Sequence, residues 1–319
     1  KFQIIRILMN RIILSICIFM QLFFCNNQSV EYIIYTSYDY NEQATEIANL
    51  YKYNDCTSIS SETICNNTTH CIWGSTNCIE SNSQINPLFA LNTQILYSDY
   101  TSPDNISPIS PNNLSSYLYN ISNGYIDNNN NFYNLKYLLI IGDETVIPPI
   151  LYQGSIPCDD YFSSMIQNSN VAPIPKLITG RILINNPNSF IQTNQIKNYV
   201  ISPEQGRWKS DMLLFCDDQF KSNKTIRGEK WHTIHSDVIY NSLKNNLNIT
   251  CLYGPDFDRQ QSISWYTQPD FTDKVIEEIN SGVSIINYIG HGTSSLLADE
   301  HILTISDIDR IFTPNNKLP

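Results

Sequence analysis

Short apolar runs alternate with amphipathic stretches along most of the chain. The runs are rich in β-branched and aromatic residues, as in strands buried in a sheet, and the stretches between them repeat apolar residues at helical spacing. The pattern predicts strands at 31–36, 94–97, 136–142, 177–183, 211–216, 249–253 and 283–289, and helices at 41–51, 111–121, 189–200, 233–243 and 271–279. Because helices separate most successive strands, we predict an α/β fold on mainly parallel sheets flanked by helices.

A Pro-containing segment, VAPIPK at 171–176, interrupts this series. Such a segment is typical of a linker between compact regions. We therefore predict an N-terminal α/β subdomain over 30–175 and a second α/β subdomain over 176–319.

Composition fits a globular protein, with 319 residues of which 42% are hydrophobic and 15% charged. The net charge is -11, and no run of basic residues occurs. Because nucleic acids and anionic membrane surfaces are bound by clustered Lys and Arg, both are excluded as expected partners.

The N-terminal region, 1–29, has the features of a signal peptide. Met9-Asn10-Arg11 precede the apolar run IILSICIFMQLFFC, and we expect cleavage between Cys25 and Ser29. A membrane anchor is the alternative, but the run is shorter than the roughly 20 residues that usually span a bilayer. We predict a secreted protein with no stable membrane span after cleavage. Secretion also agrees with glycosylation sequons at Asn67, Asn105, Asn120, Asn223 and Asn248.

Four cysteines, Cys56, Cys65, Cys71 and Cys78, fall in one polar segment, 56–78, with few apolar residues. Such a segment holds a shape only when cross-linked, so we predict a small disulfide-rich insertion with two disulfides. The sequence leaves three pairings open. Zinc binding is the alternative, although no paired Cys-x-x-Cys occurs.

The apolar run at 283–289 ends directly before His291, between Gly290 and Gly292. In open α/β sheets, active sites lie at the carboxyl ends of strands. Glycines there let the backbone approach a ligand, and the amide of Gly292 is a candidate donor to a developing oxyanion. A histidine in a simple glycine turn is the alternative. The preceding strand favours a functional histidine.

The segments NYIGHGTSS, ADEHILTISDI and NNKLP resemble the histidine segment of the gingipain-type cysteine peptidases. This family belongs to the caspase-like clan and includes related sortase-like proteins. YLLIIGDETVIPPI (137–150), IPCDDYFSSM (156–165), ITGRILINN (178–186) and WKSDMLLFCDDQF (208–220) resemble further landmarks in the family's order. The resemblance implies two side-by-side α/β subdomains, the second catalytic. It also implies a Cys-His dyad with His291 as the base, and a nucleophilic cysteine on a strand directly after Pro319, outside this sequence.

The second candidate motif is FCDDQF at 215–220, also at a strand end. A carboxylate beside the imidazole fixes its tautomer, and the resemblance implies that Asp218 takes this position, with Asp217 as its neighbour. Exposed turn aspartates, or a calcium site, are the alternative. Cys216 is considered as a nucleophile, but a cysteine that ends an apolar strand is usually a small core residue. Cys158 and Cys251 are weaker candidates.

The resemblance gives less about the substrate. Arginine-specific members have an acid at the base of the side-chain pocket, whereas here His232 or His235 stands nearest that position, so selectivity for basic residues is not predicted. Trp265 and Tyr266 are candidates for the wall of an apolar pocket, or for simple packing. No cofactor is needed; calcium is a habit of the family, but no ligand loop of recognised spacing occurs.

We therefore expect a secreted cysteine-type endopeptidase acting on protein or peptide substrates, with His291, Gly292 and Asp218 as its site residues in this chain. The alternatives are a catalytically inactive secreted or cell-surface module with the same fold, a sortase-like transpeptidase, and a carbohydrate-binding or adhesion protein. The residue at the end of the strand that follows Pro319 separates the first two.

Overall fold

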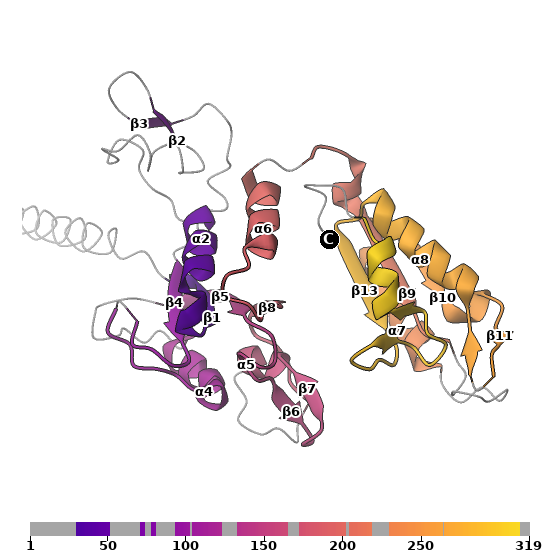
Figure 1. Ribbon diagram of the computed structural model, residues 1–319, viewed down its shortest axis with the longest axis horizontal. Helices are drawn as coiled ribbons and strands as arrows, with labels where there is room; N and C mark the ends of the chain where they lie inside the picture. The colour runs from indigo at the N-terminus through magenta and orange to yellow at the C-terminus, as the bar shows by residue number, and fades with distance from the viewer. Residues whose placement is uncertain are drawn as a thin grey trace, which may run out of the picture. The chain divides into compact units, whose positions relative to one another are not determined.

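The computed structural model describes residues 30–51, 71–73, 78–80, 93–102, 104–122, 133–164, 172–201, 204–218, 230–263 and 265–312. The chain forms two compact units, 1–193 and 194–319, which Figure 1 colours from indigo to yellow along the sequence. Each unit has its own parallel sheet. The predicted α/β fold, with parallel sheets flanked by helices, is confirmed.

Unit 1 is built on a four-stranded sheet in the order β4-β1-β5-β8. All neighbouring strands pair in parallel. The central strand β1 aligns Ile34 with Ile95 on one side and with Leu139 on the other. The strands are β1 (Val30–Thr36), β4 (Thr93–Tyr97), β5 (Tyr133–Ile141) and β8 (Ile178–Ile182).

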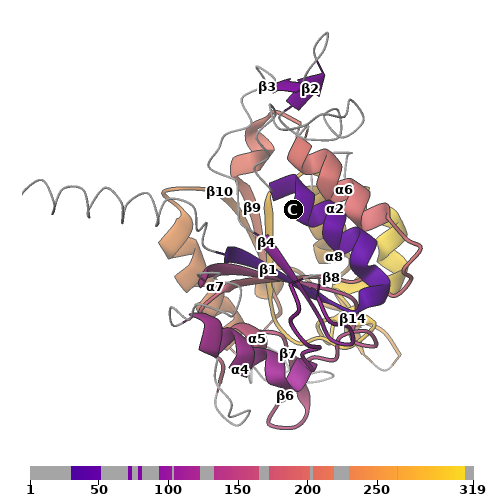
Figure 2. The same cartoon turned by 90° about the vertical axis from the view of Figure 1, so that its left-hand side faces the viewer.

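Helices cover both faces of this sheet, as Figure 2 shows, with α2 on one side and α4 and α5 on the other. Buried Leu114 and Leu118 of α4 and Phe162 of α5 pack against alternate strand residues such as Ile33 and Tyr35, because successive strand side chains point to opposite faces. The elements are η1 (Tyr38–Tyr40), α2 (Asn41–Tyr51), α4 (Pro111–Ser122), the hairpin β6 (Ile150–Tyr152) and β7 (Ile156–Cys158), and α5 (Asp160–Ser164).

The boundary between the units differs from the one predicted at residue 175. Strand β8, which follows the Pro-containing segment, pairs with β5 in the first sheet, and the units divide between Thr193 and Asn194, in the first turn of α6 (Ile191–Ile201). The prolines therefore belong to a connection inside unit 1. Backbone pairing of β8, which composition does not reveal, decides its unit.

Unit 2 contains a three-stranded parallel sheet in the order β10-β9-β13. Figure 1 shows these strands side by side. They are β9 (Asp211–Cys216), β10 (Asn248–Tyr253) and β13 (Ile285–Ile289). The helices are η4 (Arg207–Ser210), α7 (Trp231–Leu243), η5 (Gly254–Asp256), α8 (Pro269–Ser281) and η6 (Ile305–Arg310). Two antiparallel ribbons pair β11 (Gln260–Gln261) with β12 (Tyr266–Thr267) and β14 (Leu296–Leu297) with β15 (Leu303–Thr304).

The core of unit 2 forms where one face of β9 meets α8. Leu213 and Phe215 of β9 pack with Phe271, Val275 and Ile279 of α8 in one buried cluster. Phe215 and Phe271 contact edge to face, with ring centroids 6.5 Å apart. The strongly amphipathic α8 thereby holds the central strand, whose carboxyl end carries the residues considered next.

Three predicted features fall wholly or mainly outside the described residues. The signal-peptide region 1–29 is one, and the strand expected after Pro319 is another. Of the cysteine segment, the structure describes only the hairpin of β2 (Cys71–Trp73) and β3 (Cys78–Glu80). The two disulfides therefore stay a prediction. Within the described residues, no helix combines the length and apolar character that crossing a membrane requires.

Candidate active site

The strands β9 and β13 bring His291 and the two aspartates to one edge of the unit 2 sheet. Ile289, the last residue of β13, is aligned with Cys216, the last residue of β9. The parallel pairing extends one step further, because the amide of Asp217 donates to the carbonyl of Ile289 at 3.0 Å. His291 and the aspartates lie at the carboxyl edge of the sheet, as predicted from the ends of their strands.

Asp217 is the carboxylate that contacts the imidazole. Its Oδ2 lies 3.0 Å from Nδ1 of His291 and accepts the backbone amide of His291 at 3.1 Å. Its Oδ1 accepts the amide of Asp218 at 2.7 Å. The Asp217 side chain is 2% exposed, whereas that of His291 is 48% exposed. A buried, anchored carboxylate thus holds one nitrogen of a ring that is open to solvent.

Asp218, the residue matched to this position from the sequence, points elsewhere. Its Oδ2 lies 3.5 Å from Nε of Arg259, and Arg259 also pairs with Glu300, at 3.0 Å. The two aspartates follow directly on strand β9, and consecutive side chains of an extended segment point to opposite sides. Only one of the two can face the imidazole, and in this structure it is Asp217.

Arg259 forms the centre of a buried charge network beside the imidazole. Its guanidinium also lies over the ring of Tyr266, 4.0 Å from the centroid. Glu300 is 1% exposed, and burial, with the nearby charges of Asp218 and Asp217, raises its pKa to about 7. Neither Arg259 nor Glu300 was singled out from the sequence, because nothing local to them indicates that they meet.

Tyr266 and Trp265, the aromatic pair considered as a pocket wall, have separate partners. Tyr266 supports Arg259, and Trp265 stacks on His301 with ring centroids 5.2 Å apart. The pair therefore packs against charged and polar side chains, as the packing interpretation expected.

Glycines allow the close backbone approaches on which this site depends. A Cβ atom at Gly290 would lie 2.5 Å from Cβ of Asp217 and 2.2 Å from the hydroxyl of Tyr288. That hydroxyl donates to the carbonyl of His291 at 2.8 Å. At Gly254, a Cβ would lie 2.5 Å from the backbone nitrogen of Asp218. A side chain at either position would displace an aspartate.

Gly292 lies in an antiparallel bridge with Leu297. The flanking hydrogen bonds, from Thr293 to Leu296 and from Ala298 to His291, are both 2.9 Å. They make Gly292 a non-hydrogen-bonded position of the ladder, so its amide points away from Leu297. Gly292 is also exposed to solvent.

His232, in the first turn of α7, lies against His291. The two rings contact edge to face, with centroids 5.0 Å apart and planes at 87°. Nδ1 of His232 is 3.4 Å from the backbone oxygen of Asp218. The sequence placed His232 only in the substrate region, and the structure brings it to the imidazole.

Cys158, Cys216 and Cys251 lack the features of a nucleophile. Cys216 is completely buried, and burial raises the pKa of its thiol to about 11. Burial also raises the pKa values of Cys158 and Cys251. A thiol nucleophile needs the opposite shift. Cys216 thus fits the core role considered for it, on the face of β9 that carries neither Leu213 nor Phe215.

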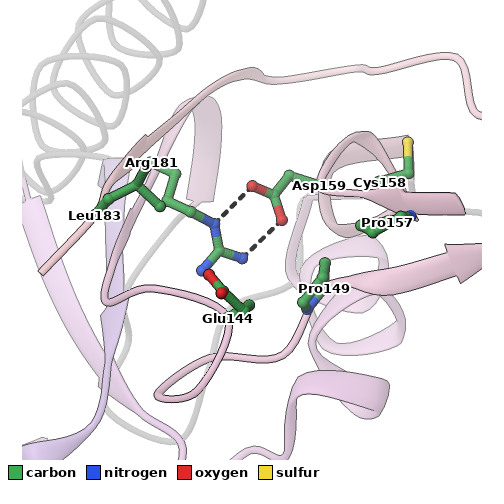
Figure 3. A pocket seen from close by; sticks show the side chains of 7 residues that line it. All are labelled: Glu144, Pro149, Pro157, Cys158, Asp159, Arg181 and Leu183. Atoms are coloured by element: carbon green, nitrogen blue, oxygen red, sulfur yellow. Dashed lines mark hydrogen bonds and ion pairs between the residues drawn. The ribbon is translucent and has the colours of Figure 1, made fainter. Parts of the chain in front are cut away.

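Unit 1 has a pocket of its own, shown in Figure 3 and lined by Glu144, Pro149, Pro157, Cys158, Asp159, Arg181 and Leu183. Two of its charged residues, Arg181 and Asp159, pair with each other. Arg181 binds Asp159 with two contacts of 2.6 Å and donates to the carbonyls of Gly142 and Ile147 at 2.8 and 3.0 Å. The arginine therefore joins the hairpin region to strand β8 and serves the fold.

Asp143, which follows β5, also has a structural role. Its carboxylate accepts the amide and the hydroxyl of Thr145, at 2.9 and 2.6 Å. These hydrogen bonds, that from the Thr145 side chain first, lower its pKa. The carboxylate therefore caps the turn that follows β5.

A histidine held by a buried carboxylate at the carboxyl edge of a parallel sheet is the base-and-acid arrangement of covalent hydrolases. The chain belongs to Peptidase family C25, whose family model matches residues 26–319. This is a family of cysteine peptidases. No match was found among curated proteins.

The fold is similar to solved gingipain structures. The complex of the pro- and mature domains of Porphyromonas gingivalis RgpB shares 16% identity, with a TM-score of 0.50, over 91% of this chain and 54% of that chain. The Arg-specific cysteine proteinase gingipain R (RgpB) shares 16% identity, with a TM-score of 0.49, over 92% of this chain and 54% of that chain. The chain thus spans about half the length of these structures.

Proposed function

We propose that this protein is a secreted cysteine endopeptidase in which His291 is the general base and Asp217 holds its ring. The observation that carries the proposal is the 3.0 Å contact between Nδ1 of the exposed His291 and the buried carboxylate of Asp217. A carboxylate oxygen accepts, so Nδ1 carries the proton and Nε2 keeps its lone pair. Nε2 can then take the proton of a thiol.

The mechanism follows from these positions. Nε2 removes the thiol proton, the thiolate attacks the peptide carbonyl, and the imidazolium returns the proton to the leaving amine. Asp217 stabilises the imidazolium through Nδ1. The amide of Gly292, which points away from Leu297, is the candidate donor to the oxyanion. Preformed backbone donors of this kind lower the barrier to acyl transfer.

The nucleophile is expected on a strand beyond residue 319 that pairs with β13. Among the described residues, β13 pairs with β9 on one side only, and Ile285 at its start is 40% exposed. A further parallel strand there would end at the same sheet edge as His291. Protein or peptide substrates follow from the family, whereas secretion rests on the N-terminal sequence.

The test uses the protein extended through the next strand and a fluorogenic peptide library. We expect hydrolysis that a thiol alkylator abolishes and a loss of about 10²- to 10⁴-fold in kcat/KM for His291→Ala and Asp217→Asn. Asp218→Asn should lose less, because its carboxylate faces Arg259. Cys216→Ser should keep the activity. The 319-residue chain should be inactive, since its base has no thiolate to serve.

Each contrary result has a defined meaning. Hydrolysis by the 319-residue chain that disappears in Cys216→Ser would move the nucleophile to Cys216. No cysteine on the following strand, together with no hydrolysis, would make the protein a non-catalytic module of the same fold. Preferential transfer of the acyl group to an added amine would identify a transpeptidase. Far-UV circular dichroism of each variant controls for misfolding.

A further inference from the structure

Three side chains from separate elements of unit 2 converge at the exposed edge of the sheet: Asp217 after β9, His232 on α7 and His291 after β13. One ligand atom of each lies within 4.8 Å of the other two. Nδ1 of His291 and Oδ2 of Asp217 are 3.0 Å apart, near the roughly 3.3 Å that separates two ligands of a tetrahedral zinc ion. Both imidazoles are partly exposed, so side-chain rotation can bring the third ligand in.

The surroundings orient these ligands before any ion arrives. The backbone oxygen of Asp218 can only accept, so its 3.4 Å contact with His232 places the proton on Nδ1 and the lone pair on Nε2. Metal-binding histidines commonly donate their other ring nitrogen to a carbonyl or a carboxylate in this way. Asp217 is fixed by two backbone amides, at 2.7 and 3.1 Å.

The donor set selects the metal. Two imidazoles and one carboxylate suit zinc, whereas calcium requires oxygen ligands. The neighbouring carboxylates of Asp218 and Glu300 add negative charge, of which Arg259 offsets one unit. The carboxylates of Asp217, Asp218 and Glu300 also cluster, but the guanidinium already serves as their cation.

We propose that Asp217, His232 and His291 bind one zinc ion, which replaces the proton shared by His291 and Asp217 and leaves the fourth position to water. The proton that Nδ1 now donates to Asp217 moves to Nε2, because a neutral imidazole that binds a metal through one nitrogen keeps its N–H on the other. Zinc binding itself does not depend on the proposed function. Its consequence, inhibition of the peptidase by removal of the base, rests on that function.

Isothermal titration of the metal-free 319-residue chain with zinc chloride tests the site. We expect one ion per chain at this site and tetrahedral visible bands on cobalt(II) substitution. His232→Ala, His291→Ala and Asp217→Asn should each weaken binding by at least about tenfold. The matched control is His235→Ala, because His235 is exposed and its ring lies against Trp231.

Equal zinc affinity in wild type, His232→Ala and His291→Ala would overturn the proposal and assign the ion to another place, such as the cysteine segment. In the extended protein, zinc should inhibit hydrolysis. His232→Ala should raise the inhibition constant for zinc at least about tenfold above that of wild type, when the activity of each protein is expressed relative to its own zinc-free rate. Zinc binding with the expected variant pattern in an inactive extended protein would refute the peptidase function and leave the zinc site standing.

Discussion

Asp217 and Asp218 are adjacent in sequence, but their carboxylates belong to two different interactions. One contacts the solvent-exposed imidazole and the other faces a buried arginine. Removing one partner of a buried ion pair lowers the free energy of unfolding by several kcal/mol. We therefore expect substitutions at Asp217 to change the chemistry of the site and substitutions at Asp218 to change the stability of unit 2.

Glu300 provides a pH-dependent test of the buried network. Its folded-state pKa is raised to about 7 from 4.5, so the folded protein binds more protons than the unfolded chain between these values. The free energy of unfolding should fall as pH rises through this window, by up to about 3 kcal/mol. Glu300→Gln, which cannot ionise, should remove this fall. The difference in free energy of unfolding between the variant and wild type should therefore shift in favour of the variant between pH 5 and pH 8.

Urea unfolding from pH 4.5 to 8.5 in the presence of EDTA measures this difference. Glu277→Gln is the control, because Glu277 is exposed and pairs with Lys274 on the surface of α8, where such pairs contribute little. A Glu300→Gln curve that stays parallel to wild type across the pH range would show that Glu300 does not titrate near neutrality.

At this scale the sequence identified His291 and the aspartate pair, because each follows an apolar run that ends at a sheet edge. It favoured Asp218, whereas the imidazole contacts Asp217, because the direction of each side chain depends on which way the chain turns after Cys216. It also missed Arg259 and Glu300, which are 41 residues apart and meet only through folding. Long-range side-chain contacts leave no local pattern.

Strand β13 and the turn after it form the element that carries His291. Tyr288 contacts both the core and the histidine. Its ring packs on Phe215, with centroids 4.9 Å apart, and its hydroxyl donates to the carbonyl of His291. The core and the histidine backbone are therefore linked through one side chain. Gly290 provides the space in which this side chain passes Asp217.

Gly290→Ala should consequently damage both stability and the site. The added methyl group overlaps Tyr288 and Asp217, and such overpacking costs about 1–3 kcal/mol. Urea unfolding should show this loss, and the zinc affinity of the chain should fall with it. Gly292→Ala is the control, since the nearest atom to its new Cβ is 3.5 Å away. Equal stability of the two variants would contradict the crowding at Gly290.

Elements were the level best predicted from the sequence. The strand predicted at 211–216 matches β9, and the helix predicted at 271–279 lies within α8. Long apolar runs and a clear helical period explain this success. Short ribbons such as β11 with β12 were not predicted, because two-residue strands have no periodicity to detect.

At the scale of the whole molecule, two units carry separate hydrophobic clusters, one around Ile33 and Tyr35 and one around Leu213 and Phe215. Substitutions confined to one cluster or its polar contacts should therefore affect that unit first. Proteins with more than one domain commonly unfold in more than one step.

Differential scanning calorimetry should resolve two transitions, and Arg181→Lys should lower only one of them. Lysine cannot reproduce the two parallel contacts with Asp159 or the bonds to the carbonyls, and the loss of charge-assisted hydrogen bonds costs about 2–3 kcal/mol. Gly290→Ala, in unit 2, should lower the other transition. A single transition that shifts equally in both variants would show that the units unfold together.

The sequence predicted two α/β regions with a boundary at residue 175, whereas the compact units of the structure divide between Thr193 and Asn194. Proline-containing segments occur both between domains and within crossover connections, and only the pairing of β8 with β5 distinguishes the two cases here. A boundary is a property of contacts between distant segments, so local composition indicates it poorly.

The contact between His291 and Asp217 joins residues 74 positions apart, which determines when the site can form during synthesis. The ribosome releases β9 and β10 first, and β13 only after α8. Closing a flexible loop of that length costs roughly 4 kcal/mol of chain entropy, so the imidazole reaches its carboxylate only when β13 joins the sheet. In a nascent chain, the contact between His291 and Asp217 therefore forms only after β9, β10 and α8 have been synthesised.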